Sequence, residues 1–163
     1  MPRYQMRQKW LSLGDDYTVK DAGGRDVYYI DGRALSIGSK LSLQDMQKNE
    51  LAFISQKLLA WGPTFEIHRS GKLVAVVKKT LLTFLRAEFT VDVPGPDDLV
   101  AQGNFWDFEY TFTRHGSEVA RVSKSFFTLT DSYGVDVNED EDDVLILAAA
   151  VVIDQCRHEK SSD

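Results

Sequence analysis

The stretch that decides the fold is "VLILAAAVVIDQC", from Val144 to Cys156, which directly follows the acidic run "NEDEDD". Between Val144 and Ile153 no side chain carries a charge or a hydrogen-bonding group. A helix without a polar face cannot lie on the surface of a soluble protein. The run is also too short to cross a bilayer, which requires about 20 apolar residues. We therefore expect this segment to be buried on all sides.

The composition of the segment and of its flanks favours an α-helix over a buried strand. The alanines at 148–150 are good helix formers and poor strand formers. Acidic residues precede the segment, and Arg157 and His158 follow it, which suits the positive N-terminus and negative C-terminus of a helix. We predict a helix over about residues 142–158. The side chains that the rest of the chain is expected to surround are Val144, Leu145, Leu147, Ala149 and Val152.

The chain before this helix, from about residue 3 to 137, is typical of short β-strands separated by turns. In "YTVKDAGGRDVYYIDG" (17–32), for example, two strand-like runs flank a turn that contains paired glycines. Many antiparallel strands and one helix that must be buried on all sides suggest that the sheet closes around the helix. Closure also removes exposed sheet edges. We therefore predict a mainly β fold: a closed antiparallel barrel of about twelve strands that encloses the C-terminal helix.

An internal repeat supports this architecture. Residues 65–84 align without gaps on residues 110–129, at an offset of 45. The identical pairs are Arg69/Arg114, Gly71/Gly116, Val74/Val119, Ala75/Ala120, Val77/Val122, Lys79/Lys124 and Thr83/Thr128. The following stretch, "EFTVDV" at 88–93, resembles "SYGVDV" at 132–137, and a weaker echo lies in "ELAFISQKLL" at 50–59. We expect two equivalent hairpins with Gly71 and Gly116 in matching turns.

Length and composition indicate a single domain over residues 1–163. A chain of 163 residues builds one substantial core rather than two. Its content of 43% hydrophobic and 27% charged residues is that of an ordinary globular protein. The net charge of −6 argues against a general nucleic-acid-binding protein, which needs a basic excess.

Cysteine usage and the first residues favour a cytoplasmic location. Cys156 is the single cysteine, so neither an intramolecular disulfide nor a multi-cysteine metal site is available. A free cysteine is usually buried and acts as a small apolar side chain. The opening "MPRYQMRQKW" lacks the apolar core of a secretory signal. We expect the protein to work in the reducing cytoplasm.

The acidic run before the helix alternates oxygen-bearing residues in the manner of a calcium loop. These residues are Asp136, Asn138, Asp140 and Asp142. The pattern departs from a calcium loop at two positions, because Glu141 replaces the turn glycine and Leu147 replaces the bidentate glutamate. We interpret the run as negative charge at a helix N-terminus, and leave cation binding by residues 136–143 open.

Other motifs predict neither a metal site nor a cofactor. His68, His115 and His158 show no short ligand spacing, whereas a zinc site needs three or four protein ligands. The sequence contains no nucleophile elbow, no phosphate-binding P-loop and no dinucleotide-binding glycine motif. The paired glycines of "DAGGRD" (21–26) precede a strand rather than a helix, which indicates a turn.

Four segments together resemble the LURP-one-related family, within the wider Tubby C-terminal-like group that includes phospholipid scramblases. They are "MRQKWLSLGDDYTVKDAGGRDVYYIDGRALSIGSKLSLQDM" (6–46), "ELAFISQKLL" (50–59), "TFEIHRSGKLVAVVKK" (64–79) and "DVLILAAAVVID" (143–154). The resemblance covers nearly the whole chain and rests on the order and spacing of the segments. It implies a twelve-stranded closed barrel around a central hydrophobic C-terminal helix.

The resemblance implies little about activity. Tubby proteins bind phosphoinositides and scramblases act in membranes, but no motif in this chain aligns residue by residue with the Tubby binding residues. The chain also lacks the membrane-inserting segment and the cysteine-rich stretches of the scramblases. Lipid scrambling is therefore not expected.

Four lysines form the candidate binding site. They are Lys57, Lys78, Lys79 and Lys124. Three of them occupy comparable places in successive hairpins, so a closed sheet is expected to bring them to one rim or face. Each lysine near an anionic lipid surface contributes about 1 kcal/mol of attraction. Alternatively, such lysines maintain solubility and protect strand edges.

We predict a non-catalytic binding module that holds an anionic lipid headgroup, another anionic ligand or a protein partner on its outer surface. Because the helix fills the interior, an internal ligand cavity is not expected. With a lipid ligand, the protein would work at the membrane periphery. The sequence leaves the oligomeric state and the identity of the ligand open.

A purely protein-interaction scaffold and an enzyme are the alternatives. The enzyme would use Asp97, Asp98 and Trp106 in "VPGPDDLVAQGNFW" (93–106). Long loops often carry function, but a Pro-Asp-Asp sequence is also typical of a simple turn. The position of Asp97 and Asp98 discriminates between these interpretations: projection of both side chains into solvent with no cleft beside them would exclude the enzyme.

Overall fold

The computed structural model describes residues 2–7, 17–33, 40–57, 64–83, 86–126 and 132–159. These residues form twelve β-strands, one 3₁₀ helix and one α-helix. In chain order they are β1 (Arg3–Arg7), β2 (Tyr17–Asp21), β3 (Asp26–Arg33), β4 (Lys40–Asp45), β5 (Glu50–Gln56), β6 (Thr64–Arg69), β7 (Lys72–Thr83), β8 (Arg86–Asp92), β9 (Leu99–Asn104), β10 (Glu109–Arg114), β11 (Ser117–Ser123), η1 (Lys124–Phe126), β12 (Ser132–Val137) and α1 (Asp143–Glu159).

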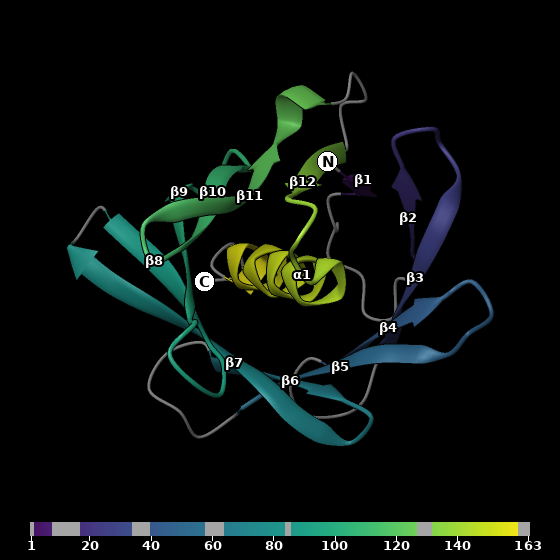
Figure 1. Ribbon diagram of the computed structural model, residues 1–163, viewed down its shortest axis with the longest axis horizontal. Helices are drawn as coiled ribbons and strands as arrows, with labels where there is room; N and C mark the ends of the chain where they lie inside the picture. Colours follow the sequence, from purple (N-terminus) through teal and green to yellow (C-terminus); the bar gives the residue numbers. More distant parts are fainter. Residues whose placement is uncertain are drawn as a thin grey trace.

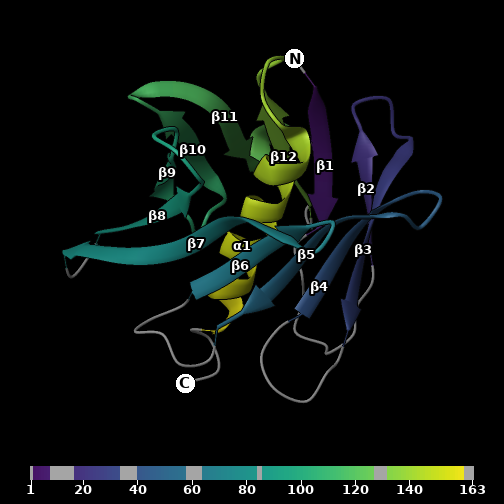
Figure 2. The same ribbon diagram turned by 60° about the horizontal axis from the view of Figure 1, so that its bottom comes forward.

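The strands form a closed barrel, as predicted. Each strand pairs antiparallel with the next strand along the chain, and β12 returns to pair with β1. The closing register runs from Arg3 opposite Asp136 to Arg7 opposite Ser132. Figure 1 shows α1 in the middle of the ring of strands. Figure 2 shows the same helix running along the interior of the barrel, towards the end where the C-terminus lies.

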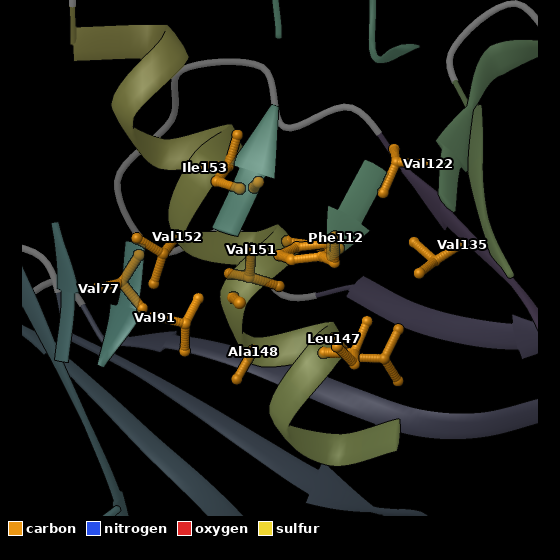
Figure 3. Close-up of a cluster of buried hydrophobic side chains, with 14 of the residues drawn as sticks. Val77, Val91, Phe112, Val122, Val135, Leu147, Ala148, Val151, Val152 and Ile153 are labelled. Carbon is orange, nitrogen blue, oxygen red and sulfur yellow. The ribbon is translucent and has the colours of Figure 1, made fainter. Parts of the chain in front are cut away.

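Helix α1 is buried as its sequence requires. The helix begins within one residue of the predicted start, and Ala148, Ala149 and Ala150 are each 0% exposed. Figure 3 shows Val77 and Val91 on one side of the helix and Val122 and Val135 on the other. Alanine is small, so the central turns of the helix leave room for these larger strand side chains in a close-packed interior. Of the five predicted helix positions, Val144, Leu147, Ala149 and Val152 are buried, and Leu145 is half-buried.

The two halves of the internal repeat have the same backbone structure. The β6–β7 turn places Ser70 and Gly71 at φ of 51° and 76°, and the β10–β11 turn places His115 and Gly116 at 51° and 80°. Such paired positive φ angles are typical of the two-residue turns that join twisted antiparallel strands. The predicted equivalence of Gly71 and Gly116 is confirmed.

The repeat extends to the strand register. The β6–β7 pair has a bulge after Ile67, and the β10–β11 pair has one after Phe112, at the equivalent position. Beyond the hairpins, Val77 pairs with Val91 and Val122 pairs with Val135. The valines on the two sides of α1 in Figure 3 are therefore repeat-related pairs.

Two further hairpins carry the same irregularity. The β2–β3 register shifts after Val19, and the β4–β5 register shifts after Leu43. A bulge bends its strand and increases the local right-handed twist, and such bending helps a sheet to close into a barrel. Four bulged hairpins thus supply part of the curvature that this barrel needs.

The barrel has two distinct ends, which we name by the helix. At the entry end, where α1 begins, lie the turns of the four bulged hairpins. At the exit end, where α1 finishes, β4 begins, β5 and β11 end, and the β9–β10 turn connects its strands. Figure 2 shows the N-terminus at the entry end and the C-terminus at the exit end.

Candidate anionic-ligand surface

Two predicted lysines lie on the outer face of the barrel: Lys57, at the exit end of β5, and Lys78, across β6 from it. The backbone N–H of Lys57 donates to the carbonyl oxygen of Thr64 at 2.8 Å, and Thr64 pairs with Lys78. The neighbouring pair, Phe65 and Val77, is buried in the interior. Because side chains alternate along a strand, Lys57 and Lys78 face outward. Two strand spacings place their backbones about 10 Å apart.

The sequence analysis missed a third lysine on this face. Lys40 begins β4 and pairs with Ser55, while the next pair, Leu41 with Ile54, is buried. Lys40 therefore faces outward, diagonally beside Lys57. The alternation in "KLSLQD" (40–45) was sufficient to predict an outward Lys40. Its nearness to Lys57 depends on the pairing of β4 with β5, which the local pattern does not contain.

The ion pairs of the outward lysines are weak. Lys57 Nζ lies 3.3 Å from Glu66 Oε1, and Lys78 Nζ lies 3.7 Å from Asp92 Oδ2. The two lysine side chains are 55% and 53% exposed. Exposed pairs of this kind contribute little to stability because water and salt screen them. Both ammonium groups can therefore exchange these carboxylates for an incoming anion at small cost.

Lys79 faces the interior side of the sheet. It pairs with Phe89, which is buried, and its Nζ lies 6.0 Å from the centroid of that ring. Lys78 and Lys79 are adjacent in one strand, so they cannot share a face. The predicted set of four lysines is thus divided between the two faces of the barrel wall. Phe89 continues into an edge-on contact with Phe105, at 4.9 Å between ring centroids.

Lys124, the repeat partner of Lys79, also lies over an aromatic ring. Its Nζ is 5.4 Å from the centroid of Phe108, which stacks on Tyr133 with 4.4 Å between ring centroids. The backbone N–H of Lys124 donates to Glu109 Oε1 at 3.1 Å, and the same oxygen accepts the hydroxyl of Ser123 at 2.7 Å. These contacts fix the position of η1 at the end of β11.

The β9–β10 turn lies between these two lysine–aromatic contacts. It contains Phe105, Trp106, Asp107 and Phe108. On one side of the turn, Lys79 lies over the ring of Phe89, which contacts Phe105. On the other side, Lys124 lies over the ring of Phe108. Trp106, near the tip of the turn, is 53% exposed. We define the exit-end surface as the outward lysines Lys40, Lys57 and Lys78 together with Lys124 and Trp106; Lys79 borders it from the interior side of the wall.

The residues of the enzyme alternative are not brought together. Asp97 Oδ1 lies 3.0 Å from His115 Nε2, and Asp98 Oδ1 accepts the backbone N–H of Val93 at 2.8 Å. Both aspartates precede β9 at the entry end, whereas Trp106 follows β9 at the exit end. The six residues of β9 span about 17 Å. Asp97 and Asp98 therefore stabilise a loop at a distance from Trp106.

The acidic run is bound to the barrel wall at the entry end. Arg114 Nη1 donates to both carboxylate oxygens of Glu141, at 2.6 and 2.7 Å, and Arg69 pairs with Asp142. These two arginines are themselves repeat partners. The hydroxyl of Tyr4 donates to Asp143. Burial and this hydrogen bond raise the pKa of Tyr4 well above its ordinary value, so the hydroxyl remains a donor at physiological pH.

Asp136 and Asn138 of the run are also bound to the barrel. Asp136 accepts from Nε and Nη2 of Arg3, at 2.5 and 2.8 Å, and Asn138 Nδ2 donates to the carbonyl oxygen of Glu118 at 3.0 Å. Over the described ranges, no three histidine, cysteine or acidic side chains are grouped as metal ligands would be. The side chain of His158 lies outside the described residues.

Helix α1 contains 17 residues. Within the ranges that the structure covers, no helix is both long enough and apolar enough to span a bilayer.

The chain is similar to known proteins over nearly its whole length. A profile of the LURP-one-related family matches residues 3–154. The uncharacterised protein YxjI of Bacillus subtilis (strain 168) is 30% identical over 149 residues, which are 91% of this chain and 90% of that protein.

Structural comparison agrees on the fold. The X-ray structure of a protein from Arabidopsis thaliana superposes with a TM-score of 0.67, and the superposition covers 94% of this chain and 90% of that one. The two sequences are 14% identical, so this likeness concerns the fold alone. From the profile match and the bacterial relative, we conclude that the chain belongs to the LURP-one-related family.

Proposed function

We propose that this protein is a non-catalytic, cytoplasmic binding module that holds anionic lipid headgroups on its exit-end surface. One observation carries the proposal: Lys40, Lys57 and Lys124, far apart in the sequence, lie at the end of the barrel where β4 begins and β5 and β11 end, and Lys78 faces outward beside Lys57 across β6. Helix α1 fills the interior of the barrel, and Ala148 to Ala150 are completely buried. A filled interior supports a binding site on the outer surface. The separation of Asp97 and Asp98 from Trp106 supports binding rather than catalysis.

The distribution of charge favours one orientation towards an anionic surface. The chain carries a net charge of −6, and its densest acidic run, 136–143, lies at the entry end. Arg3, Arg69 and Arg114 pair with three carboxylates of this run, and the other acidic side chains of the run make the entry end less attractive to an anionic membrane than the exit end. With about 1 kcal/mol for each lysine near the surface, the lysines supply a few kcal/mol at low salt. Binding is expected to weaken as the ionic strength rises.

Sedimentation with vesicles tests this proposal. We expect the protein to bind phosphatidylcholine vesicles that contain phosphatidylserine or a phosphoinositide, and not vesicles of phosphatidylcholine alone. The triple substitution Lys57→Gln, Lys78→Gln and Lys124→Gln should reduce binding about a hundredfold at low salt, since three such contacts contribute about 3 kcal/mol.

The matched control makes the same change in charge at the other end of the barrel. Lys20, Lys48 and Lys72 lie at or beside the entry-end turns, and their replacement by glutamine should leave binding unchanged. Equal losses in both triple variants would show a nonspecific effect of net charge. Wild-type protein that ignores anionic vesicles at low salt would refute the lipid proposal, and a protein partner would then be the ligand to seek.

A further inference from the structure

Trp106 is held in an exposed position by a rigid turn. Asn104 Nδ2 donates to Asp107 Oδ2 at 2.8 Å, and the backbone N–H of Asp107 donates to Asn104 Oδ1 at 3.1 Å. The backbone N–H of Phe108 donates to the carbonyl oxygen of Phe105 at 3.4 Å. An indole on such a turn loses little conformational freedom when it meets a partner, which favours binding.

The aromatic neighbours of Trp106 anchor the turn on both sides. Phe105 contacts Phe89 and Tyr110, with ring centroids 4.9 and 5.0 Å apart, and Phe108 is buried against Tyr133. Phe108 adopts φ of 53°, a left-handed conformation that is unfavourable for a bulky residue. Burial of the Phe108 ring against Tyr133 offsets this strain, and the turn so formed leaves Trp106, two residues earlier, at the surface.

The charges beside the turn indicate what kind of partner Trp106 meets. The repeat-related lysines, Lys79 and Lys124, lie over aromatic rings on the two sides of the turn. An indole prefers the headgroup level of a bilayer, where its apolar ring and its polar N–H are both accommodated. Lysine side chains next to it can reach lipid phosphates while their alkyl chains remain against apolar groups.

We propose that the exit end docks on an anionic bilayer with Trp106 inserted at the headgroup level and the surrounding lysines bound to lipid phosphates. This inference rests on the proposed function and deepens it, because it names the bilayer surface as the partner and Trp106 as the anchor. The wide spacing of the lysines favours an extended anionic surface over a single small anion. Lys57 and Lys78 are separated by about two strand spacings, and Lys124 lies beyond the β9–β10 turn, so the lysines face several headgroups at once.

The test compares Trp106→Ala with wild-type protein on vesicles of phosphatidylcholine and phosphatidylserine. Removal of an inserted indole should weaken binding of the protein to these vesicles about tenfold or more. The matched control is the double variant Met46→Ala and Leu73→Ala, which removes exposed large apolar side chains beside the entry-end turns and should bind as the wild type does. Because Trp106 is half exposed, Trp106→Ala should keep the wild-type melting temperature within a few degrees.

Fluorescence supplies a second measurement that reports insertion directly. Trp10 and Trp61 also emit, so the signal of Trp106 is taken as the difference between wild-type protein and Trp106→Phe. Anionic vesicles should shift this difference spectrum to shorter wavelength, and lipids brominated near the headgroup should quench it.

The outcomes separate this inference from the proposed function. If Trp106→Ala binds vesicles as the wild type does and the difference spectrum stays unshifted, insertion is refuted while lysine-dependent headgroup binding stands. If wild-type protein binds soluble inositol hexakisphosphate but not vesicles, the bilayer is the wrong partner and anion binding stands. If it binds neither, both proposals fail.

Discussion

Gly71, Gly103 and Gly116 show how much a single backbone position contributes to this barrel. Gly71 and Gly116 adopt left-handed conformations, with φ of 76° and 80°, and a Cβ added at either would meet no atom within 4 Å. Gly103 has φ of 141°, and a Cβ there would lie 2.6 Å from the carbonyl oxygen of Glu109. The first two glycines are needed for conformation alone, whereas Gly103 is also needed for the close approach of β9 to β10.

Alanine substitution should reveal this difference. Gly71→Ala and Gly116→Ala should each lower the free energy of unfolding by about 1 to 2 kcal/mol, the cost of a left-handed alanine. Gly103→Ala should cost clearly more, because its Cβ meets fixed backbone. Urea unfolding of the three variants measures these losses. Unequal losses at Gly71 and Gly116 would contradict the equivalence of the two turns.

Asp45 provides a prediction for acid stability. The side-chain amide of Asn49 and the backbone N–H groups of Asn49 and Gln47 hydrogen-bond to this carboxylate and hold its pKa below the ordinary 3.8. A carboxyl with a lowered pKa stabilises the fold above its unfolded pKa, and that contribution is lost as the pH falls through the folded value. The stability that Asp45 contributes is therefore lost below about pH 4.

The variant Asp45→Asn removes this titration while keeping an oxygen that can accept the backbone N–H groups. We expect it to be less stable than the wild type at pH 7, with a difference that shrinks as the pH falls from 4 towards 2. Chemical unfolding at a series of pH values tests this. Two stability curves that stay parallel below pH 4 would show that Asp45 is not linked to folding.

At the scale of secondary-structure elements, the entry end attaches α1 to the sheet. Arg114 binds Glu141 with both carboxylate oxygens, and these side chains are 24% and 13% exposed. The equivalent pair, Arg69 with Asp142, is 36% and 45% exposed. A partly buried, bidentate pair is stronger than an exposed one, so the two halves of the repeat hold the helix start with unequal strength.

Removal of each arginine should therefore have a different cost. Arg114→Ala leaves a largely buried carboxylate without its cation, and we expect a loss of about 2 kcal/mol. Arg69→Ala should cost less than about 1 kcal/mol, because water replaces the lost contact. Thermal unfolding of the two variants measures the contrast, and the addition of Glu141→Gln to Arg114→Ala should recover part of the larger loss. A smaller effect at Arg114 than at Arg69 would show that burial does not control these pairs.

At the scale of the whole molecule, the barrel and the helix depend on each other. The strands close around α1, and the helix occupies the volume that closure creates. Repeat-related valines lie on opposite sides of the helix (Figure 3) and belong to one buried core, so both halves of the repeat contribute to that core. Neither the closed sheet nor the apolar helix can be stable in water alone, since each would expose a large apolar area.

Ala149→Glu tests this mutual dependence. Ala149 is 0% exposed, so the new carboxylate must either lose its hydration or become protonated. We expect a loss of several kcal/mol, a large part of the 5–15 kcal/mol available to a domain, and an insoluble or unfolded protein. The control Ala22→Glu introduces the same charge in an exposed turn and should cost less than about 0.5 kcal/mol; Glu139→Ala should be similarly silent. Cooperative melting of soluble Ala149→Glu near the wild-type temperature would rule out a central helix.

The sequence by itself determined the features that depend on local pattern. The uninterrupted apolar run from Val144 to Ile153 required burial on all sides, and the repeat at an offset of 45 predicted two equivalent hairpins. Both follow from residues that are close in the chain, because periodicity and turn chemistry are local properties. The predicted lysines were likewise identified from their places in successive hairpins.

Only the tertiary structure decided which of these residues meet. The register of neighbouring strands places Lys40 beside Lys57, and closure of the barrel brings Arg69 and Arg114 to the acidic run before α1. The order of strands β7 to β11 puts Lys79 and Lys124 on either side of the β9–β10 turn, which presents Trp106. The enzyme alternative had placed Trp106 in one site with Asp97 and Asp98. These contacts join residues far apart in the chain. They depend on strand order and register, and a local pattern determines which face a side chain occupies but not which distant strand lies next to it.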